Sequence, residues 1–224
     1  MDKQIEYIAE ALKLDLPDFE CPDIGQTPAE IINNLKIVRQ LDPKVILEIG
    51  SATGGFFYML SAALSNKKRT FISIDPWTEG TKYERQYHIY DETINNLKKF
   101  YPNNQYFRIR RRSEDVRATE ELKIMLKDQK IDFLFIDGAH TYQSVMNDWL
   151  NYSQFLNEKS VVAFHDIVEY GEVNQAWKEI SSQNNNYTHQ EFKEEGIPLL
   201  TSLGETDAKF SKPIVLGVGY LFKN

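Results

Sequence analysis

Short apolar runs alternate along most of the chain with stretches whose apolar residues recur at helical spacing. From residue 44 onward this pattern predicts parallel β-strands separated by amphipathic helices, with Ser113 as the N-cap of the third helix. The predicted strands are 44–50, 70–75, 105–110, 131–138 and 160–167, and the predicted helices between them are 55–65, 82–101, 113–129 and 141–156.

The end of the chain departs from that alternation. After a helix predicted at 172–183, two strand-like runs, 187–195 and 213–223, follow with only a loop between them. A hairpin of this kind makes the last strand antiparallel to its neighbours. The sequence therefore predicts a Rossmann-like α/β fold, with a doubly wound, mostly parallel sheet of seven strands and an antiparallel last strand.

Two helices are predicted before the first strand. Residues 3–14 carry apolar side chains at helical spacing, and the stretch TPAEIINNLKIVRQL begins a second helix. In that stretch Thr27 and Glu30 have the spacing of a capping box, in which each side chain bonds the other residue's backbone N–H. We expect residues 1–43 to form a helical cap on the substrate side, and residues 44–224 to form the domain that contains the sheet.

Composition excludes several classes of partner. The 224 residues carry a formal net charge of −7, which disfavours nucleic-acid binding. No apolar run approaches the ~20 residues that span a bilayer, and we do not expect the acidic, amphipathic N-terminus to be a secretory signal. Cys21 is the single cysteine, so cytoplasmic residence is expected.

The basic run 108–112 is interpreted either as a solvated strand end or as a patch that attracts an anionic substrate.

A glycine turn follows the first strand of the predicted sheet. The stretch EIGSATGG places Glu48 at the end of that strand, and Gly50 and Gly54 in the turn. Glycine permits positive φ and close approach of the backbone to a ligand. The spacing does not match the G-x-G-x-x-G pattern that binds a pyrophosphate. The turn suits a cofactor that has no pyrophosphate and carries a cationic end.

A second acid follows the next strand. Asp75 lies 21 residues after Gly54, at the end of the second predicted strand. A carboxylate at this place can accept hydrogen bonds from both hydroxyls of a ribose. Strand-end acids are individually common as helix caps, but two of them at successive strand ends point to a nucleoside cofactor.

From these motifs the chain resembles the class I S-adenosylmethionine-dependent methyltransferases over residues 44–224. The resemblance implies that Glu48 and the turn hold the methionine end of the cofactor, that Asp75 holds the ribose, and that the adenine lies after the third strand. Trp77 would stack on the adenine or serve as a structural aromatic. The cofactor residues implied in this way are Glu48, Gly50, Ser51, Thr53, Gly54, Asp75, Trp77, Ser113, Glu114 and Asp137.

A second group of polar residues follows strands four and five. Asp137 and His140 come after one strand, and His165 and Asp166 after the other. Adjacent strands lie about 5 Å apart, so the two aspartates should face one crevice. Two carboxylates so close would repel each other unless one is protonated or a cation lies between them. The alternative interpretation is that these residues are loop caps and satisfied polar side chains.

The stretches IDGAH and FHD resemble a metal-assisted branch of these methyltransferases, which contains the cephalosporin hydroxylase/rhamnosyl methyltransferase-like group and the macrolide sugar O-methyltransferases. The resemblance implies a divalent cation, magnesium or manganese, on Asp137, His165 and Asp166. It also implies a catalytic role for Asp137 and for His140 as general base. The branch has an acid where this chain has His165, which favours a softer metal, an outer position for His165, or no metal.

The predicted function is S-adenosylmethionine-dependent O-methylation of a hydroxyl on a sugar or other small polyol. The alternatives are a non-catalytic protein that binds this cofactor, and a methyltransferase that uses another acceptor without metal. A metal-dependent hydroxylase is disfavoured, because such an enzyme needs no adenosyl site. The expected partner is a small-molecule substrate, with no nucleic acid and no membrane, and the chain is a possible homo-oligomer.

Overall fold

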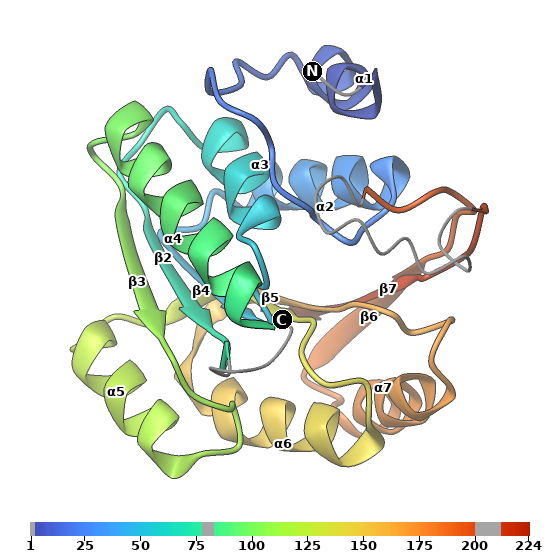
Figure 1. Ribbon diagram of the computed structural model, residues 1–224. Coiled ribbons are helices and arrows are strands. Elements are labelled where there is room, and N and C mark those ends of the chain that lie inside the picture. Colours follow the sequence, from blue (N-terminus) through green and yellow to red (C-terminus); the bar gives the residue numbers. More distant parts are fainter. Residues whose placement is uncertain (1–2, 78–82, 200–211) are drawn as a thin grey trace.

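A seven-stranded sheet runs through the middle of the protein (Figure 1). The computed structural model describes residues 3–77, 83–199 and 212–224. Its strands lie in the order β3-β2-β1-β4-β5-β7-β6, and β7 is antiparallel to both β5 and β6. This confirms the predicted sheet. The strands are β1 (Val45–Ile49), β2 (Thr70–Ile74), β3 (Gln105–Ile109), β4 (Ile131–Ile136), β5 (Leu156–Phe164), β6 (Tyr187–Phe192) and β7 (Val218–Lys223).

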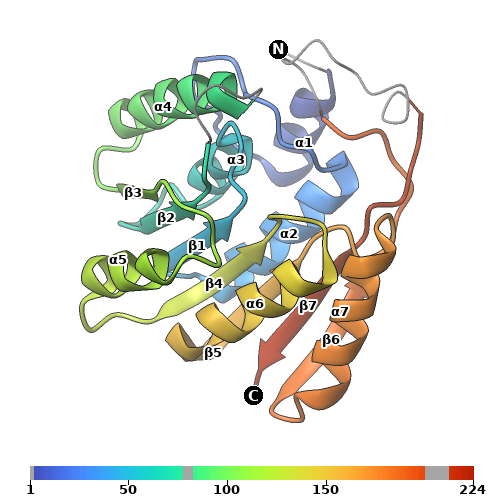
Figure 2. The ribbon, with the colours of Figure 1, turned by 60° about the horizontal axis from the view of Figure 1, so that its bottom comes forward.

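Helices cover both faces of the sheet, as Figures 1 and 2 show from two directions. One face carries α2 (Pro28–Leu41), α3 (Gly55–Ala63) and α4 (Tyr83–Phe100), with α1 (Lys3–Leu12) packed on α2. The other face carries α5 (Val116–Leu126), α6 (Tyr142–Tyr152) and α7 (Gly171–Gln183), and a short 3-10 helix, η1 (Ser153–Phe155), joins α6 to β5. Among the described helices, none is long and apolar enough to cross a membrane.

The two helix layers bury opposite sides of the same strands. In β1, Ile46 packs with the layer that contains α2 and α3, whereas Leu47 packs with the layer of α5 and α6. Residues on both sides of a central strand are therefore apolar, which is why the strands appear in the sequence as continuous apolar runs. Ile31 and Leu35 of α2 are fully buried in the first of these layers. The division of the chain at residue 43 stays a prediction.

The N-caps of α2 and α5 were both predicted from local sequence, with different outcomes. The predicted capping box is present at α2, where the Thr27 N–H donates to Glu30 and the Glu30 N–H donates to the Thr27 hydroxyl. The prediction that Ser113 caps α5 is wrong. A turn in which the Asp115 N–H donates to the Arg112 carbonyl delays the helix, and Asp115 is its N-cap. Ser113 is left in the loop after β3, beside the cavity described below.

The strand order fixes where a ligand can bind. From β1 the chain proceeds outward through β2 to β3, and then returns to β4 on the other side of β1. The loops after β1 and β4 therefore diverge to opposite faces of the sheet, and a crevice opens between them. Open α/β sheets bind ligands at such a point, at the carboxyl ends of the strands.

Candidate active site

A cavity of about 730 Å³ lies at this point of divergence. Its volume falls in the range of small-molecule sites. The loops after β1, β2, β3, β4 and β5 line it, together with the segment before α2. Of the residues predicted from sequence, those that line the cavity are Glu48, Gly50, Ser51, Thr53, Asp75, Ser113, Glu114, Asp137, His140, His165 and Asp166.

The glycine turn brings two strand ends together. Gly50 has φ +88°, and a Cβ atom at this position would lie 1.9 Å from the carbonyl oxygen of Asp137. Only glycine allows this approach of the loops after β1 and β4. Gly54, with φ +83°, is the N-cap of α3, and as a glycine it has no side chain that could accept a hydrogen bond from the first N–H groups of the helix. The turn therefore leaves the start of α3 beside the cavity.

Glu48 is a buried acid at the cavity, and no cation among the described residues pairs with it. Its side chain is buried at the wall of the cavity, and its Oε2 atom has no hydrogen-bond partner within the described part of the chain. Burial raises the pKa of Glu48 to about 8, and the negative charges of Asp137 and Asp75 add to that effect. A positively charged ligand group would supply the missing partner, so this site fits the cationic end of a cofactor.

Asp75 links the loops after β1 and β2. Its Oδ2 atom accepts a hydrogen bond from the Ala52 N–H and its Oδ1 atom accepts one from the Trp77 N–H, both at 3.0 Å. Burial raises the pKa of Asp75 to about 6, although these two bonds oppose the shift. The carboxylate is therefore held in one orientation at the rim of the cavity, with lone pairs left to accept from a ligand.

Trp77 is not brought to the cavity. Its indole is fully buried against Tyr90, with 4.5 Å between ring centroids, and its Nε1–H donates to the Ala52 carbonyl at 2.7 Å. This geometry is that of a structural aromatic. The Thr53 hydroxyl also bonds within the protein. It donates to the Asp23 carbonyl at 2.7 Å and so links the turn to the segment before α2.

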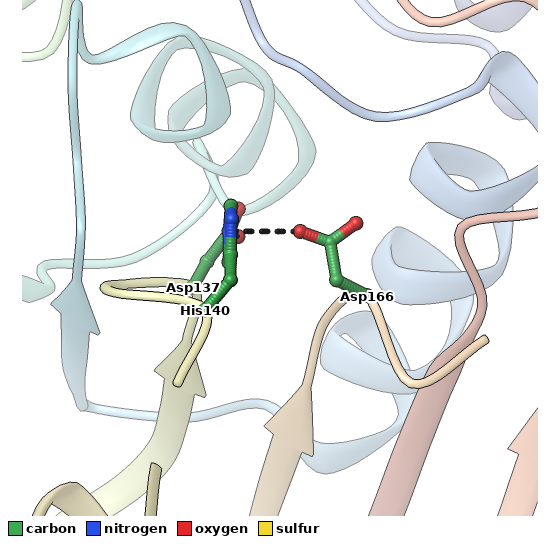
Figure 3. A group of neighbouring side chains, drawn as sticks. All are labelled: Asp137, His140 and Asp166. Atoms are coloured by element: carbon green, nitrogen blue, oxygen red, sulfur yellow. Dashed lines mark ion pairs between the residues drawn. The ribbon is translucent and has the colours of Figure 1, made fainter. Parts of the chain in front are cut away.

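Three side chains converge on the other side of the cavity (Figure 3). Asp137 and His140 come from the loop after β4, and Asp166 follows β5. The Nε2 atom of His140 lies 2.9 Å from Oδ2 of Asp166 and 3.9 Å from Oδ1 of Asp137. One ligand atom from each residue lies within 4.8 Å of the others, so the group could hold a single metal ion. Asp166 has φ 62°, a strained conformation of the kind found at functional sites.

The charges of this cluster are strongly coupled. Burial disfavours the charged form of His140, but the neighbouring carboxylates of Asp137 and Asp166 outweigh it and raise the pKa of His140 to about 9. Burial also opposes ionisation of Asp166, yet the neighbouring His165 and the bond from His140 hold the pKa of that carboxyl below its usual range. The imidazolium of His140 thus lies where the two carboxylates attract a positive charge. Its ring is stacked on Tyr170, with 4.1 Å between ring centroids.

His165 is close to the cluster but is not part of it. Its Nδ1 atom lies 3.2 Å from Oδ1 of Asp137, and its Nε2 atom points away from the cavity, 3.6 Å from Oε2 of Glu30. The sequence predicted Asp137, His165 and Asp166 as the metal ligands. The structure groups Asp137 and Asp166 with His140 instead, and places His165 behind Asp137.

Sequence reasoning missed several residues of the site. Tyr170 follows β5 by six residues, Pro198 and Leu216 come from the ends of the last loop, and Asp23 and Gly25 precede α2. None of them belongs to a recognisable motif. They reach the cavity because β7 inserts beside β5 and the Leu199 N–H donates to the Gln26 carbonyl at 2.9 Å. Residues 78–82 and 200–211 lie outside the described residues.

The basic run 108–112 is largely neutralised by neighbouring acids. Arg108 pairs with Asp91, Arg111 with Glu121 and Arg112 with Glu114. Of the five residues in the run, Arg112 lines the cavity. These pairs fit the interpretation of a solvated strand end.

The sheet order, the antiparallel last strand and the acid–glycine turn after β1 define a class I methyltransferase fold. A sequence profile described as "Methyltransferase domain" matches residues 47–167, from β1 to the loop after β5. The match covers more than half of the chain, and the chain belongs to this methyltransferase family.

Two curated relatives are uncharacterised proteins. The protein R132 of Acanthamoeba polyphaga mimivirus is 28% identical over 147 residues, which are 62% of this chain and 59% of that protein. The protein y4gI of Sinorhizobium fredii is 29% identical over 192 residues, which are 76% of this chain and 20% of that protein. The chain thus spans less than two thirds of either relative.

Several solved structures share the fold. The O-methyltransferase TomG from Streptomyces achromogenes, in complex with S-adenosylmethionine, superimposes with a TM-score of 0.62 at 14% identity, covering 100% of this chain and 91% of that one. An O-methyltransferase from Bacillus cereus with S-adenosylhomocysteine gives 0.60 at 13%, covering 100% and 92%. CalS11, a TDP-rhamnose 3'-O-methyltransferase, gives 0.59 at 12%, covering 98% and 93%. At these identities the likeness establishes the fold.

Proposed function

We propose that the protein transfers the methyl group of S-adenosylmethionine to a hydroxyl of a sugar or other small polyol, with the help of a divalent cation. One observation supports this most directly: Glu48 and Asp75 line the same cavity as the Asp137–His140–Asp166 cluster. A cofactor held by the first pair would therefore be adjacent to an acceptor held at the second.

The cofactor side of the cavity is formed by β1, β2 and β3. Glu48 would hold the cationic methionine end, because it is a buried carboxylate with one oxygen that no described residue bonds. Asp75 would accept from the ribose hydroxyls, and Ser113 and Glu114 lie where the adenine would reach the loop after β3. When bound, S-adenosylmethionine supplies an activated methyl group. The protein's task is to hold that group in line with the acceptor oxygen.

The acceptor side offers a cation site and a base. Asp137 and Asp166 are the two carboxylates that would hold a divalent ion, and their separation suits one ion. A cation there would lower the pKa of a bound hydroxyl. His140 would then take the proton. Its side chain is 36% exposed, against 18% and 6% for the two aspartates, so it is the member of the group most accessible from the cavity.

The choice of a sugar or polyol rests on chemistry and on one likeness. Two neighbouring hydroxyls can chelate one metal ion, and Tyr170 beside His140 offers a flat ring on which a sugar could pack. Among the structures that share the fold, CalS11 acts on a TDP-rhamnose. Both points fit a hydroxyl-rich acceptor.

A direct assay tests the proposal. The purified protein is incubated with methyl-labelled S-adenosylmethionine, Mn²⁺ and a panel of neutral sugars and polyols, with and without EDTA. Label should pass to the hydroxyl of at least one acceptor, with stoichiometric S-adenosylhomocysteine, and EDTA should abolish the transfer. Cofactor binding without turnover on any hydroxyl-bearing acceptor would instead indicate a binding protein.

A metal-free methyltransferase is the second candidate. It is favoured by the ion pair of His140 with Asp166, in which the imidazolium already offsets one of the two aspartate charges. In that case His140 and Asp166 would act as a base and its orienting acid. Full activity after exhaustive chelation, with no metal by elemental analysis, would establish this candidate in place of the first.

A further inference from the structure

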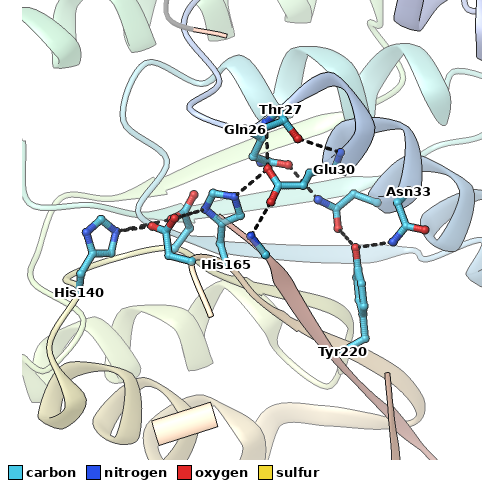
Figure 4. A network of polar contacts seen from close by, with 11 residues as sticks. Gln26, Thr27, Glu30, Asn33, His140, His165 and Tyr220 are labelled. Carbon is cyan, nitrogen blue, oxygen red and sulfur yellow. Dashed lines mark hydrogen bonds and ion pairs between the residues drawn. The ribbon is translucent and has the colours of Figure 1, made fainter. Parts of the chain in front are cut away.

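A buried acid lies behind the site, on helix α2, which packs against one face of the sheet. Glu30 is in the first turn of α2, and its side chain has 0% exposure. Figure 4 shows it facing His165. The other side of the His165 ring faces Asp137. The Oε2 atom of Glu30 lies 3.6 Å from Nε2 of His165. The sequence assigns Glu30 only a capping role, and that role does not require burial.

Backbone donors from two segments fix this carboxylate. Oε2 accepts from the Thr27 N–H at 2.9 Å, and Oε1 accepts from the Gly217 N–H at 2.8 Å. The first donor belongs to the start of α2 and the second to the residue just before β7. With both oxygens engaged, the side chain is held in one orientation, and the His165 ring finds a negative charge at a defined place.

His165 is held equally firmly. It is buried, and its backbone N–H donates to the Ile136 carbonyl at 3.0 Å, which continues the pairing of β4 with β5. The ring can therefore adjust only by rotation of its side chain. One ring nitrogen faces Asp137 at 3.2 Å, with Asp166 further away at 3.5 Å, and the other ring nitrogen faces Glu30. The negative charge of Glu30 favours the ring orientation that presents Nδ1 to Asp137.

We infer that Glu30 is a positioning residue of the cation site: through His165 it fixes the orientation of the Asp137 carboxylate. The inference rests on the proposed function, in which Asp137 and Asp166 hold a divalent ion. Carboxylate ligands need partners behind them to point their oxygens at the metal, and removing such a partner typically lowers metal affinity by about 10–100-fold. Here the partner is a His–Glu pair that reaches from the sheet to the N-terminal helices.

The same helix offers a matched control. Asn34 is one turn further along α2 and is also fully buried. Its Nδ2–H donates to Gln26 at 2.8 Å, and its Oδ1 accepts from the Tyr220 hydroxyl at 2.7 Å. Neither bond leads to His165. Asn34→Ala therefore removes two buried hydrogen bonds from α2 and leaves the path from Glu30 to Asp137 in place.

Binding of Mn²⁺, measured by the loss of the free-ion EPR signal, tests the inference without any turnover. Glu30→Gln should raise the dissociation constant for Mn²⁺ by about 10–100-fold. The dissociation constant for S-adenosylmethionine should stay within about twofold, and Asn34→Ala should leave Mn²⁺ binding unchanged. In a His165→Gln background, Glu30→Gln should have no further effect, because the path is already broken. If Glu30→Gln does not fold, Glu30→Asp, which withdraws the charge by one methylene, replaces it with the same expected direction.

The outcomes separate the inference from the function on which it rests. An unaltered Mn²⁺ affinity in folded Glu30→Gln, while the intact protein binds Mn²⁺ and uses it in methyl transfer, would overturn the role of Glu30 alone. An equal loss in Asn34→Ala, or an undiminished effect of Glu30→Gln in the His165→Gln background, would also overturn it, since the effect would then be structural. Failure of the intact protein to bind Mn²⁺ would remove both the cation and this role.

Discussion

Nε2 of His140 and Oδ2 of Asp166 lie 2.9 Å apart, although the two residues follow different strands. The parallel pairing of β4 with β5, with Ile136 beside Phe164, brings their loops to the same edge of the sheet. His140 thereby neutralises carboxylates that would otherwise repel. A divalent ion on those carboxylates would compete with His140, so metal binding and the protonation of His140 are linked.

Replacement of His140 separates a base from a structural residue. His140→Ala should leave cofactor binding nearly intact and lower turnover by about 10²–10⁴-fold, the usual range for general acid–base catalysis. The acceptor-dependent rate and the melting temperature are measured on the same variant. Near-normal turnover by a well-folded variant would pass the role of base to Asp137. Loss of Mn²⁺ affinity would make His140 a ligand.

The pH profile of the intact enzyme should report the same group. A protonated imidazole cannot accept a proton, so activity should fall as pH drops through the pKa of His140. That pKa is raised from 6.5 to about 9 when the aspartates bind no cation. With Mn²⁺ competing for the aspartates, the midpoint of kcat should move down from the value found without the cation. A kcat that does not vary from pH 6 to 10 would contradict a histidine base.

The two aspartates should act together in binding the cation. Asp166→Asn keeps the size of the side chain but removes its charge, and should weaken Mn²⁺ binding by roughly tenfold or more. Asp132→Asn serves as control, because Asp132 lies at the opposite end of β4 and accepts from the Lys44 and Val45 N–H groups. Equal Mn²⁺ affinity in the two variants would exclude Asp166 as a ligand.

Asp148, a buried acid of α6, should make stability depend on pH. Burial raises its pKa from 3.8 to about 7, so the folded state holds a proton that the unfolded chain has lost. Stability due to this group is therefore full below about pH 4, falls as pH rises to about 7, and then stays level. Asp148→Asn should raise the melting temperature at pH 8 by about 2–4 °C, near 1 kcal/mol for a chain of this size, and have little effect at pH 4.

The matching control for this prediction is Asp128→Asn, which changes an exposed acid after α5. It should leave the melting temperature unaltered at both pH values. Equal melting temperatures for Asp148→Asn and the intact protein at pH 8 would show that Asp148 carries no unfavourable charge in the fold.

Sequence periodicity predicted the sheet because each central strand is buried on both faces, and the terminal hairpin because two strand-like runs follow α7 without a helix. It could not place Asp115 rather than Ser113 at the start of α5, since both residues are good caps and only the turn at Arg112 decides between them. Trp77 is buried because it packs on Tyr90 of α4. The pattern of apolar positions does not predict which residues of two separate segments will contact each other.

The candidate site was predictable where residues follow strands. Asp137 and Asp166 reach the cavity because parallel strands end at one edge of the sheet. The roles of the two histidines were not predictable in the same way, because the left-handed backbone at Asp166 turns its carboxylate toward His140 while His165 points back toward α2. Glu30 carries no sequence signal beyond a helix cap, since its burial comes from the return of the chain to β7 beside it.

The measurement that tests the account most directly is calorimetric titration of S-adenosylmethionine into the intact protein and into Asp75→Ala. The intact protein should bind one equivalent. The variant loses the carboxylate that would accept from the ribose, and its binding should weaken by roughly 2–3 kcal/mol, the scale of hydrogen bonds to a charged group. No binding by the intact protein, or the same dissociation constant in folded Asp75→Ala, would contradict a nucleoside cofactor at the ends of β1 and β2.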